Sequence, residues 1–140
     1  MSSREIFPKP SSIGQRDWGE EILLVLASEK YTLKKLTIRA GKKGGLQYHR
    51  KKDEAAFILS GEMILRFDCG DGNLQKKYLK KGDFFHIPPG LVHQEEAVTD
   101  VEIIEVSTPH FNDRVRVELD YGHDDTDGLP STELNEIEFK

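Results

Sequence analysis

Hydrophobic and polar positions alternate along most of this chain, in short segments that end at turn residues. The apolar run EEILLVLAS (20–28) precedes YTLKKLTIRA (31–40), in which Leu33, Leu36 and Ile38 stand among lysines and threonines. A period of two residues is typical of strands, because successive side chains point to opposite faces. Both segments are therefore predicted to be strands.

The middle of the chain continues the same pattern. AAFILSGEMILRFD (55–68) predicts two strands that bend at Gly61, and CGDGN (69–73) carries an Asp-Gly hairpin signal. Pro88 and Pro89 belong in a loop, because proline cannot donate a hydrogen bond to a strand ladder. Further strands are predicted within three segments: LQKKYL (74–79), FFHIPPGLVHQEE (84–96) and DVEIIEVS (100–107).

About eight to ten short strands follow from this pattern, with no convincing helix before the C-terminal segment. The predicted fold class is all-β, as a closed barrel or sandwich. With 140 residues, 36% hydrophobic and 32% charged, the chain is expected to form one soluble globular domain.

The net charge of -5 is concentrated at the C-terminus. Residues 123–140 hold six acidic side chains against one lysine, so the rest of the chain is close to neutral. A near-neutral body predicts neither nucleic acid nor an anionic membrane as a partner. The acidic tail is expected to be solvated, or to pair as a short strand at NEIEFK (135–140).

The cysteine content and the N-terminal sequence both bear on the cellular location. Cys69 is the only cysteine, which excludes an intrachain disulfide and favours a reducing compartment. Residues 1–18 lack the apolar core of a signal peptide, and no apolar run approaches the ~20 residues that cross a bilayer. We therefore expect a cytoplasmic protein.

Candidate metal ligands stand in the segment GGLQYHRKKDEAAFILSGE (44–62). Gln47 and His49 are two residues apart and would share one face of a strand. Glu54 begins the next apolar strand, and His93 lies far along the chain. Two imidazoles, a carboxylate and an amide oxygen suit a divalent ion, and four such ligands would leave two adjacent positions of an octahedral ion open. By spacing alone, each histidine could equally be a hydrogen-bonded polar residue.

Two spaced motifs resemble the cupin superfamily. In the first, His49 is followed by four residues and Glu54, then by six residues and Gly61. The second motif reads GDFFHIPPGLVH, with the spacing of Gly82, Pro88, Gly90 and His93. The resemblance implies a small double-stranded β-helix, or jelly-roll barrel, over residues 18–122. It places an N-terminal arm at residues 1–17 and an acidic tail at 123–140.

The cupin resemblance also implies a ligand set and a dimer. The metal would be held by Gln47, His49, Glu54 and His93. Zn, Mn, Fe, Ni or Co would suit these ligands, and the sequence does not distinguish among them. Gln47 could instead orient the other ligands by hydrogen bonding. Because cupins commonly pair through terminal strands, a homodimer is expected.

One branch of the superfamily is closest in pattern, the C-terminal cupin domain of type II mannose-6-phosphate isomerases. The resemblance rests on Trp18-Gly19, on Gln47 in place of the first histidine of a His-x-His pair, and on IIEVSTPHFNDRVRVELDYG (103–122). It implies a sugar or sugar-phosphate ligand and aldose–ketose isomerisation through a metal-stabilised enediolate.

The departures from that branch fall where activity would be decided. Lys52 replaces an arginine, Ala55-Ala56 replaces His-Trp, Ala97 replaces an asparagine and His123 replaces an arginine. Two other functions therefore remain open. The two alanines favour a non-catalytic metal- and sugar-binding module that assists sugar biosynthesis. An iron-dependent dioxygenase is the third possibility, and Gln47 argues against it.

Spacing does not single out a general base. The candidates are Lys52 and Glu95, with His86 a third by rough location. Candidate substrate-binding residues are Lys52, His86 and Tyr121. Each has a structural alternative, because Lys52 could be a solvated turn residue, His86 a core or pocket-wall residue, and Tyr121 a packing residue of the returning C-terminal segment.

Overall fold

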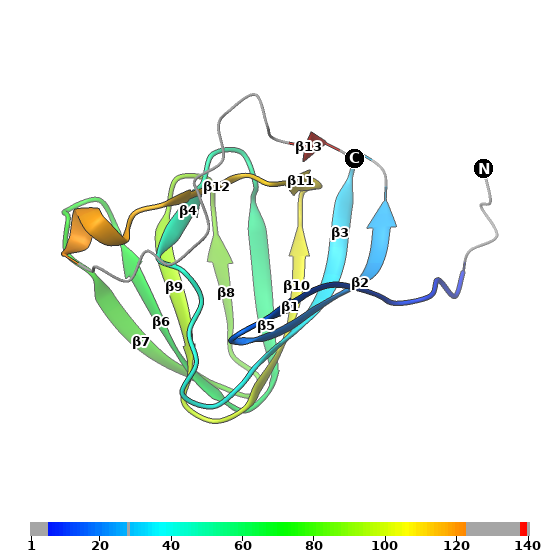
Figure 1. The fold of residues 1–140 in the computed structure, drawn as a ribbon, viewed down its shortest axis with the longest axis horizontal. Coiled ribbons are helices and arrows are strands. Elements are labelled where there is room, and N and C mark those ends of the chain that lie inside the picture. Colours follow the sequence, from blue (N-terminus) through cyan, green and yellow to red (C-terminus); the bar gives the residue numbers. More distant parts are fainter. Residues whose placement is uncertain (1–5, 28, 123–137, 140) are drawn as a thin grey trace.

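The computed structural model describes residues 6–27, 29–122 and 138–139, and within them the chain is almost entirely β-structure. Two antiparallel sheets form the walls of a jelly-roll barrel, as predicted (Figure 1). Among the described residues, no helix has the length and apolar character needed to cross a membrane.

The larger sheet has six strands in the order β1-β2-β3-β10-β5-β8. Its strands are β1 (Ser11–Arg16), β2 (Gly19–Ala27), β3 (Tyr31–Ile38), β5 (Glu54–Ser60), β8 (Phe84–Ile87) and β10 (Val101–Ser107). All neighbouring pairs are antiparallel. The central pairing joins β10 to both β3 and β5, so this wall of the barrel depends on contacts between distant parts of the chain.

The smaller sheet has five strands in the order β12-β4-β9-β6-β7. Its strands are β4 (Gln47–His49), β6 (Glu62–Asp68), β7 (Gln75–Lys80), β9 (Val92–Ala97) and β12 (Arg114–Arg116). A separate two-stranded pair joins β11 (His110–Phe111) to β13 (Glu138–Phe139). The end of the chain therefore does pair as a short strand, while the rest of the predicted acidic tail lies outside the described residues.

The core lies between the two sheets and follows the alternation read from the sequence. On β3, Leu36 and Ile38 are 7% and 2% exposed, whereas Thr37 between them is only half-buried. Ile58, Met63 and Ile103 are buried at 1% exposure or less and join the same cluster. Trp18 packs against this cluster, so it contributes to closing the core.

Three details of the element prediction can be compared with the structure. The Asp-Gly hairpin is found, since β6 and β7 pair in register. As predicted, the chain before residue 123 is almost without helix in the part that the structure describes, apart from one turn of 3₁₀ helix, η1, at Glu118–Tyr121. The segment predicted as an N-terminal arm contains β1, which pairs with β2 at the edge of the larger sheet.

The predicted bend at Gly61 is the point where the chain passes from one sheet to the other. Gly61 has φ +89°, and a Cβ added there would lie 2.1 Å from the carbonyl oxygen of Asp100. Because both the backbone conformation and the close approach require glycine, we expect Gly61→Ala to lower the free energy of unfolding by about 3 kcal/mol or more. Urea denaturation measures this change.

Gly72 provides the matched control for that substitution. It also has a positive φ, of +83°, but a Cβ added there would meet nothing within 4 Å. Gly72→Ala should therefore cost only about 1 kcal/mol, the backbone contribution alone. Equal losses in the two variants would show that the contact with Asp100 does not constrain the bend.

Candidate metal centre

Three buried side chains from three strands converge inside the barrel. His49 of β4, Glu54 of β5 and His93 of β9 place one ligand atom each within 4.8 Å of one another. Nε2 of His49 lies 3.0 Å from Oε1 of Glu54, and Nε2 of His93 lies 3.6 Å from the same oxygen. β5 belongs to one sheet and the other two strands to the opposite sheet, so the cluster forms only when the barrel closes.

Both imidazoles are oriented by backbone carbonyls. Nδ1 of His49 lies 3.0 Å from the carbonyl oxygen of Asp113, and Nδ1 of His93 lies 2.9 Å from that of Leu91. A carbonyl can only accept, so each Nδ1 carries the hydrogen and donates it. In the neutral ring of His93, Nε2 then presents its lone pair toward Glu54, the arrangement that second-shell hydrogen bonds produce at metal sites.

The charge state of the cluster calls for a cation. Burial, partly offset by the Glu54 carboxylate, lowers the pKa of His93 to about 4, so this ring is neutral at pH 7. Burial alone would raise the pKa of Glu54, but the charge of Lys52 and hydrogen bonds from Glu105 and His49 hold it well below its usual range. A neutral imidazole and a carboxylate thus face each other with lone pairs only, and a divalent ion suits this donor set.

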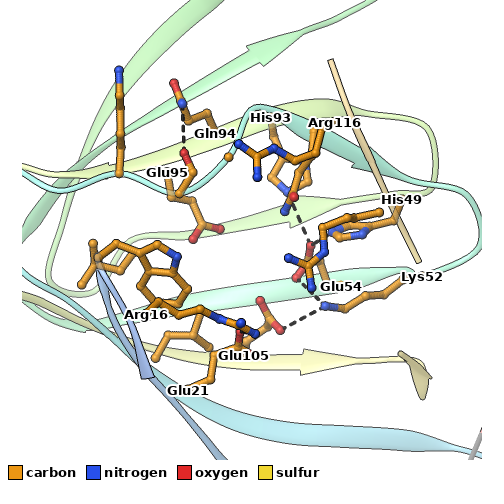
Figure 2. Close-up of a pocket in the computed structure, with 18 of the residues that line it drawn as sticks. Arg16, Glu21, His49, Lys52, Glu54, His93, Gln94, Glu95, Glu105 and Arg116 are labelled. Carbon is orange, nitrogen blue, oxygen red and sulfur yellow. Dashed lines mark hydrogen bonds and ion pairs between the residues drawn. The ribbon is translucent and has the colours of Figure 1, made fainter. Parts of the chain in front are cut away.

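The cluster lines a cavity of about 810 Å³ whose walls are rich in charged side chains (Figure 2). Gln47 lines the same cavity, and its backbone pairs with His93 in register. Residues directly opposite in an antiparallel pair project to the same face, so Gln47 and His93 are neighbours on this wall. Ligation by Gln47 stays a prediction.

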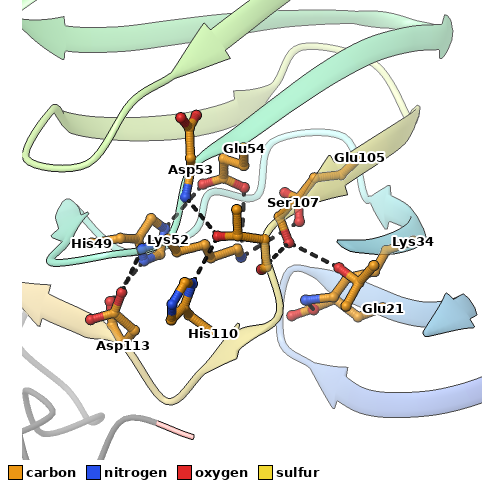
Figure 3. A network of polar contacts seen from close by, with 12 residues as sticks. Glu21, Lys34, His49, Lys52, Asp53, Glu54, Glu105, Ser107, His110 and Asp113 are labelled. Atoms are coloured by element: carbon orange, nitrogen blue, oxygen red, sulfur yellow. Dashed lines mark hydrogen bonds and ion pairs between the residues drawn. The ribbon is translucent and has the colours of Figure 1, made fainter. Parts of the chain in front are cut away.

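A network of buried charges lies behind Glu54 (Figure 3). Nζ of Lys52 is 3.6 Å from Glu54 and 3.6 Å from Glu105. The Lys34 ammonium lies 3.5 Å from Glu21 on the neighbouring strand. Burial first, and then the Glu54 carboxylate, raises the pKa of Glu105 well above its ordinary value, so Glu105 keeps its proton and donates it to Glu54.

Asp113 shapes the loop that delivers Lys52 to the cavity. Its carboxylate accepts hydrogen bonds from the backbone N–H groups of Arg50, Lys51 and Lys52, at 2.8 to 3.2 Å. Its carbonyl oxygen is the acceptor that orients His49. One residue near the C-terminal end of the barrel therefore positions both a candidate ligand and a candidate substrate-binding side chain.

Glu95 stands on the cavity wall, on the same strand as His93 and two residues further along. Figure 2 shows its carboxyl group pointing into the cavity. Burial, and then the charge of Glu54, raises the pKa of Glu95 to about 8. A carboxyl group whose pKa lies near neutrality can both accept and return a proton.

The other predicted site residues are not all brought to the cavity. Lys52 lines it, whereas His86 lies on the outer face, where its Nε2 is 2.7 Å from Asp53 and its side chain is 62% exposed. Tyr121 belongs to η1 and donates its hydroxyl hydrogen to Asp68. Neither His86 nor Tyr121 lines the cavity around the candidate ligands.

The two alanines after Glu54 face opposite ways. Ala56 is buried in the core cluster, while Ala55 lies on the other face of β5 and pairs with His86. Alternation along a strand gives only one of the two positions access to the barrel interior. Only at Ala56 does an alanine therefore stand in the interior where the isomerase branch has a larger side chain. This weakens the argument for a non-catalytic module, which counted both alanines.

Several site residues were missed from the sequence, although a signal existed for two of them. Lys34 shares the inward face of β3 with Leu36, and Glu105 shares that of β10 with Ile103. A charged residue at an inward position of an alternating strand indicates a functional interior. The arginines at positions 16, 114 and 116 line the cavity as well, and no comparable pattern pointed to them.

Residues 34–107 match the family model of the cupin domain, and this range holds the three clustered residues and both spaced motifs. The chain belongs to the cupin family. No curated protein matches this cupin in sequence. The resemblance to the isomerase branch stays a prediction.

Three of the solved structures similar to this cupin show the extent of the likeness. The capsular polysaccharide assembling protein CapF from Staphylococcus aureus is 21% identical with a TM-score of 0.64, over 75% of this chain and 30% of CapF. An RmlC-like cupin from Shewanella frigidimarina is 19% identical with a TM-score of 0.61, over 74% and 89% of the two chains. KdgF from Halomonas sp. is 14% identical with a TM-score of 0.58, over 69% and 84%.

At these identities the likeness shows the fold alone. The cupin described here also spans less than a third of the length of CapF.

Proposed function

We propose that this cupin holds a divalent metal ion at His49, Glu54 and His93, with Gln47 as a fourth ligand, and isomerises a sugar or sugar phosphate between its aldose and ketose forms. The supporting observation is the convergence of two oriented Nε2 atoms on one buried carboxylate at the wall of a polar cavity. A bound ion would act as a Lewis acid, favouring negative charge on the substrate oxygens.

Glu95 is the candidate that best fits the proton transfer. Burial disfavours the charged form of Lys52, but Glu105 and Glu54 outweigh it and raise the lysine pKa, so Lys52 stays protonated and cannot accept a proton. His86 lies outside the cavity. In the proposed reaction, the Glu95 carboxylate takes the proton from C2 of the aldose and returns it to C1, while the proton of the O2 hydroxyl passes to O1, giving the ketose.

Lys52 and Glu105 have a positioning role in this proposal. Lys52 compensates the Glu54 carboxylate from one side, and the protonated Glu105 donates a hydrogen bond to it. Together they keep Glu54 ionised and directed at the two imidazoles. The name of CapF, a capsular polysaccharide assembling protein, is consistent with a carbohydrate ligand.

Hydrogen–deuterium exchange at C2 of candidate sugars tests the proposal. The full chain, loaded in turn with Mn, Co, Ni or Zn, is incubated in D₂O with mannose 6-phosphate, glucose 6-phosphate and neutral hexoses, and deuterium is followed by NMR. We expect exchange with at least one metal and sugar, and a loss of at least about 100-fold in Glu95→Gln.

Two outcomes contradict isomerisation, and a third contradicts the role of Glu95. Bound metal and a sugar-dependent thermal shift without exchange would identify a binding module. Oxygen consumption with Fe(II) would identify a dioxygenase. Exchange that persists at the wild-type rate in Glu95→Gln would remove Glu95 from the mechanism.

A further inference from the structure

Three arginines line the same cavity as the candidate metal ligands: Arg16 of β1, and Arg114 and Arg116 of β12. β12 pairs with β4, so that Arg114 stands opposite His49 and Arg116 opposite Gln47. Directly opposite residues of an antiparallel pair project to the same face, with Cβ atoms about 5 Å apart. Both β12 arginines are thus cross-strand neighbours of the residues proposed to bind the metal.

Two glycines leave room for two of these guanidinium groups. A Cβ added at Gly45 would lie 2.6 Å from Nε of Arg116, and one added at Gly14 would lie 3.0 Å from Cζ of Arg16. Neither glycine has a positive φ, so the backbone conformation itself does not require glycine at either position. A side chain at either position would instead displace the arginine that packs over it.

The arginines are brought together despite their like charge. Burial first, and then the positive charge of Arg16, lowers the pKa of Arg114, and Arg116 contributes in the same direction. Glu118 accepts hydrogen bonds from Nε and Nη2 of Arg116, and Glu21 lies 3.4 Å from Arg16, which offsets part of the charge. Three guanidinium groups on the walls of one cavity favour an anion there.

Lys52, a candidate substrate-binding residue from the sequence, is less suited to bind an anionic group. Its ammonium lies 3.6 Å from the Glu54 carboxylate and 3.6 Å from the carboxyl group of Glu105, and its side chain is 13% exposed. Arginine also presents a planar fork that matches phosphate and carboxylate oxygens two at a time. Figure 2 shows the guanidinium groups of Arg16 and Arg116 extending over the cavity from opposite sides.

We propose that Arg16, Arg114 and Arg116 form a subsite for the anionic group of the ligand, a phosphate or carboxylate carried by the molecule whose oxygens reach the metal. The identification of that molecule as a sugar rests on the proposed function, whereas the anion subsite itself does not. The proposal restricts the substrates to charged sugars and excludes neutral hexoses as good ligands.

Calorimetric titration with inorganic phosphate tests the subsite directly. The full chain is titrated as purified and again after treatment with a chelator, so that binding to arginines is separated from binding to metal. We expect phosphate to bind in both states, and Arg114→Gln and Arg16→Gln each to weaken binding at least about tenfold. Lys77→Gln, an exposed cation of β7 away from the cavity, should bind as the wild type does.

Thermal unfolding of each variant establishes that it is folded. Arg16 lies on an edge strand, where a substitution disturbs the fold less than in the middle of a sheet. Arg16→Gln therefore still tests the subsite if Arg114→Gln does not fold. Equal phosphate affinity in the wild type and the folded arginine variants would overturn the proposal. So would the absence of phosphate binding by the folded, chelator-treated wild type.

Two further measurements separate this proposal from the proposed function. Titration with glucose 6-phosphate, glucuronate and glucose distinguishes phosphate from carboxylate, and glucose is expected to bind at least about tenfold more weakly than the better anion. Elemental analysis of the same samples reports the metal. Arginine-dependent phosphate binding in a protein that retains no metal would support the subsite and contradict the metal centre.

Discussion

A double variant, His49→Ala with His93→Ala, is expected to purify with trace metal only, whereas the wild-type chain retains about one divalent ion per chain. The substitution removes both Nε2 atoms that face Glu54 and leaves a single carboxylate beside Lys52. Changes to outer-shell partners of metal ligands already cost about 10- to 100-fold in affinity, so the loss of two ligands should exceed about 100-fold. Elemental analysis and competition with a chromophoric chelator measure it.

Two single variants complete the metal experiment, one as a control and one as a test of Gln47. His86→Ala removes an exposed histidine that pairs with Asp53 outside the cavity, and it should retain the wild-type metal content. Gln47→Ala should weaken binding by about tenfold if the amide oxygen is a ligand. Equal trace metal in the wild type and the double variant would show that the cluster does not bind a divalent ion.

The stability of the metal-free protein is expected to fall between about pH 5 and pH 8, and Glu95→Gln is expected to remove much of that fall. Burial, followed by the charge of Glu54, raises the pKa of Glu95 from 4.5 to about 8. Below pH 4.5 the group is protonated in the folded and unfolded states alike. Above it, the unfolded chain releases the proton while the folded chain retains it, so the unfolding free energy decreases until the pH reaches about 8.

The size of the effect follows from 1.36 kcal/mol for each pKa unit, which gives roughly 3–5 kcal/mol across the window. Urea denaturation in chelator at pH 5 and pH 8 measures the difference between the wild type and Glu95→Gln. Between pH 5 and pH 8, the unfolding free energy of the wild type should fall by much more than that of Glu95→Gln. Parallel pH profiles would show that Glu95 ionises as readily in the folded state as in the unfolded chain.

Adding a divalent ion provides a second arm of this experiment. A positive charge at the candidate ligands favours the ionised form of Glu95, so its pKa should move back down. The pH dependence of the wild type should then become shallower, while that of Glu95→Gln changes less. A steeper wild-type profile with metal would contradict the placement of the ion near Glu95.

The alternation along β3 and β10 also indicates which charged residues face the barrel interior. Leu36 and Ile38 share the inward face of β3, and the same alternation puts Lys34 on that face. Glu105 follows Ile103 in the same way on β10. The alternation therefore gave a signal for both charged residues, although the sequence prediction did not include them.

Residues placed by long-range pairing could not be assigned from the sequence. His86 and Tyr121 lie outside the cavity, since β8 turns His86 outward and η1 directs the Tyr121 hydroxyl to Asp68. Arg114 and Arg116 enter the site because β12 pairs with β4, more than sixty residues earlier in the chain. The homodimer, the cytoplasmic location and the identity of the metal stay predictions.

By itself, the sequence determined the all-β fold and the bend at Gly61. These features follow from local rules, a period of two along each strand and glycine where φ is positive. The set of His49, Glu54 and His93 came from the two spaced motifs and their resemblance to cupins. Tertiary structure alone decided which side chains share the cavity with that cluster and how Glu54, Glu95 and Glu105 differ in pKa. The reason is physical: burial and the charge of a neighbour depend on strands that meet only after the barrel has closed.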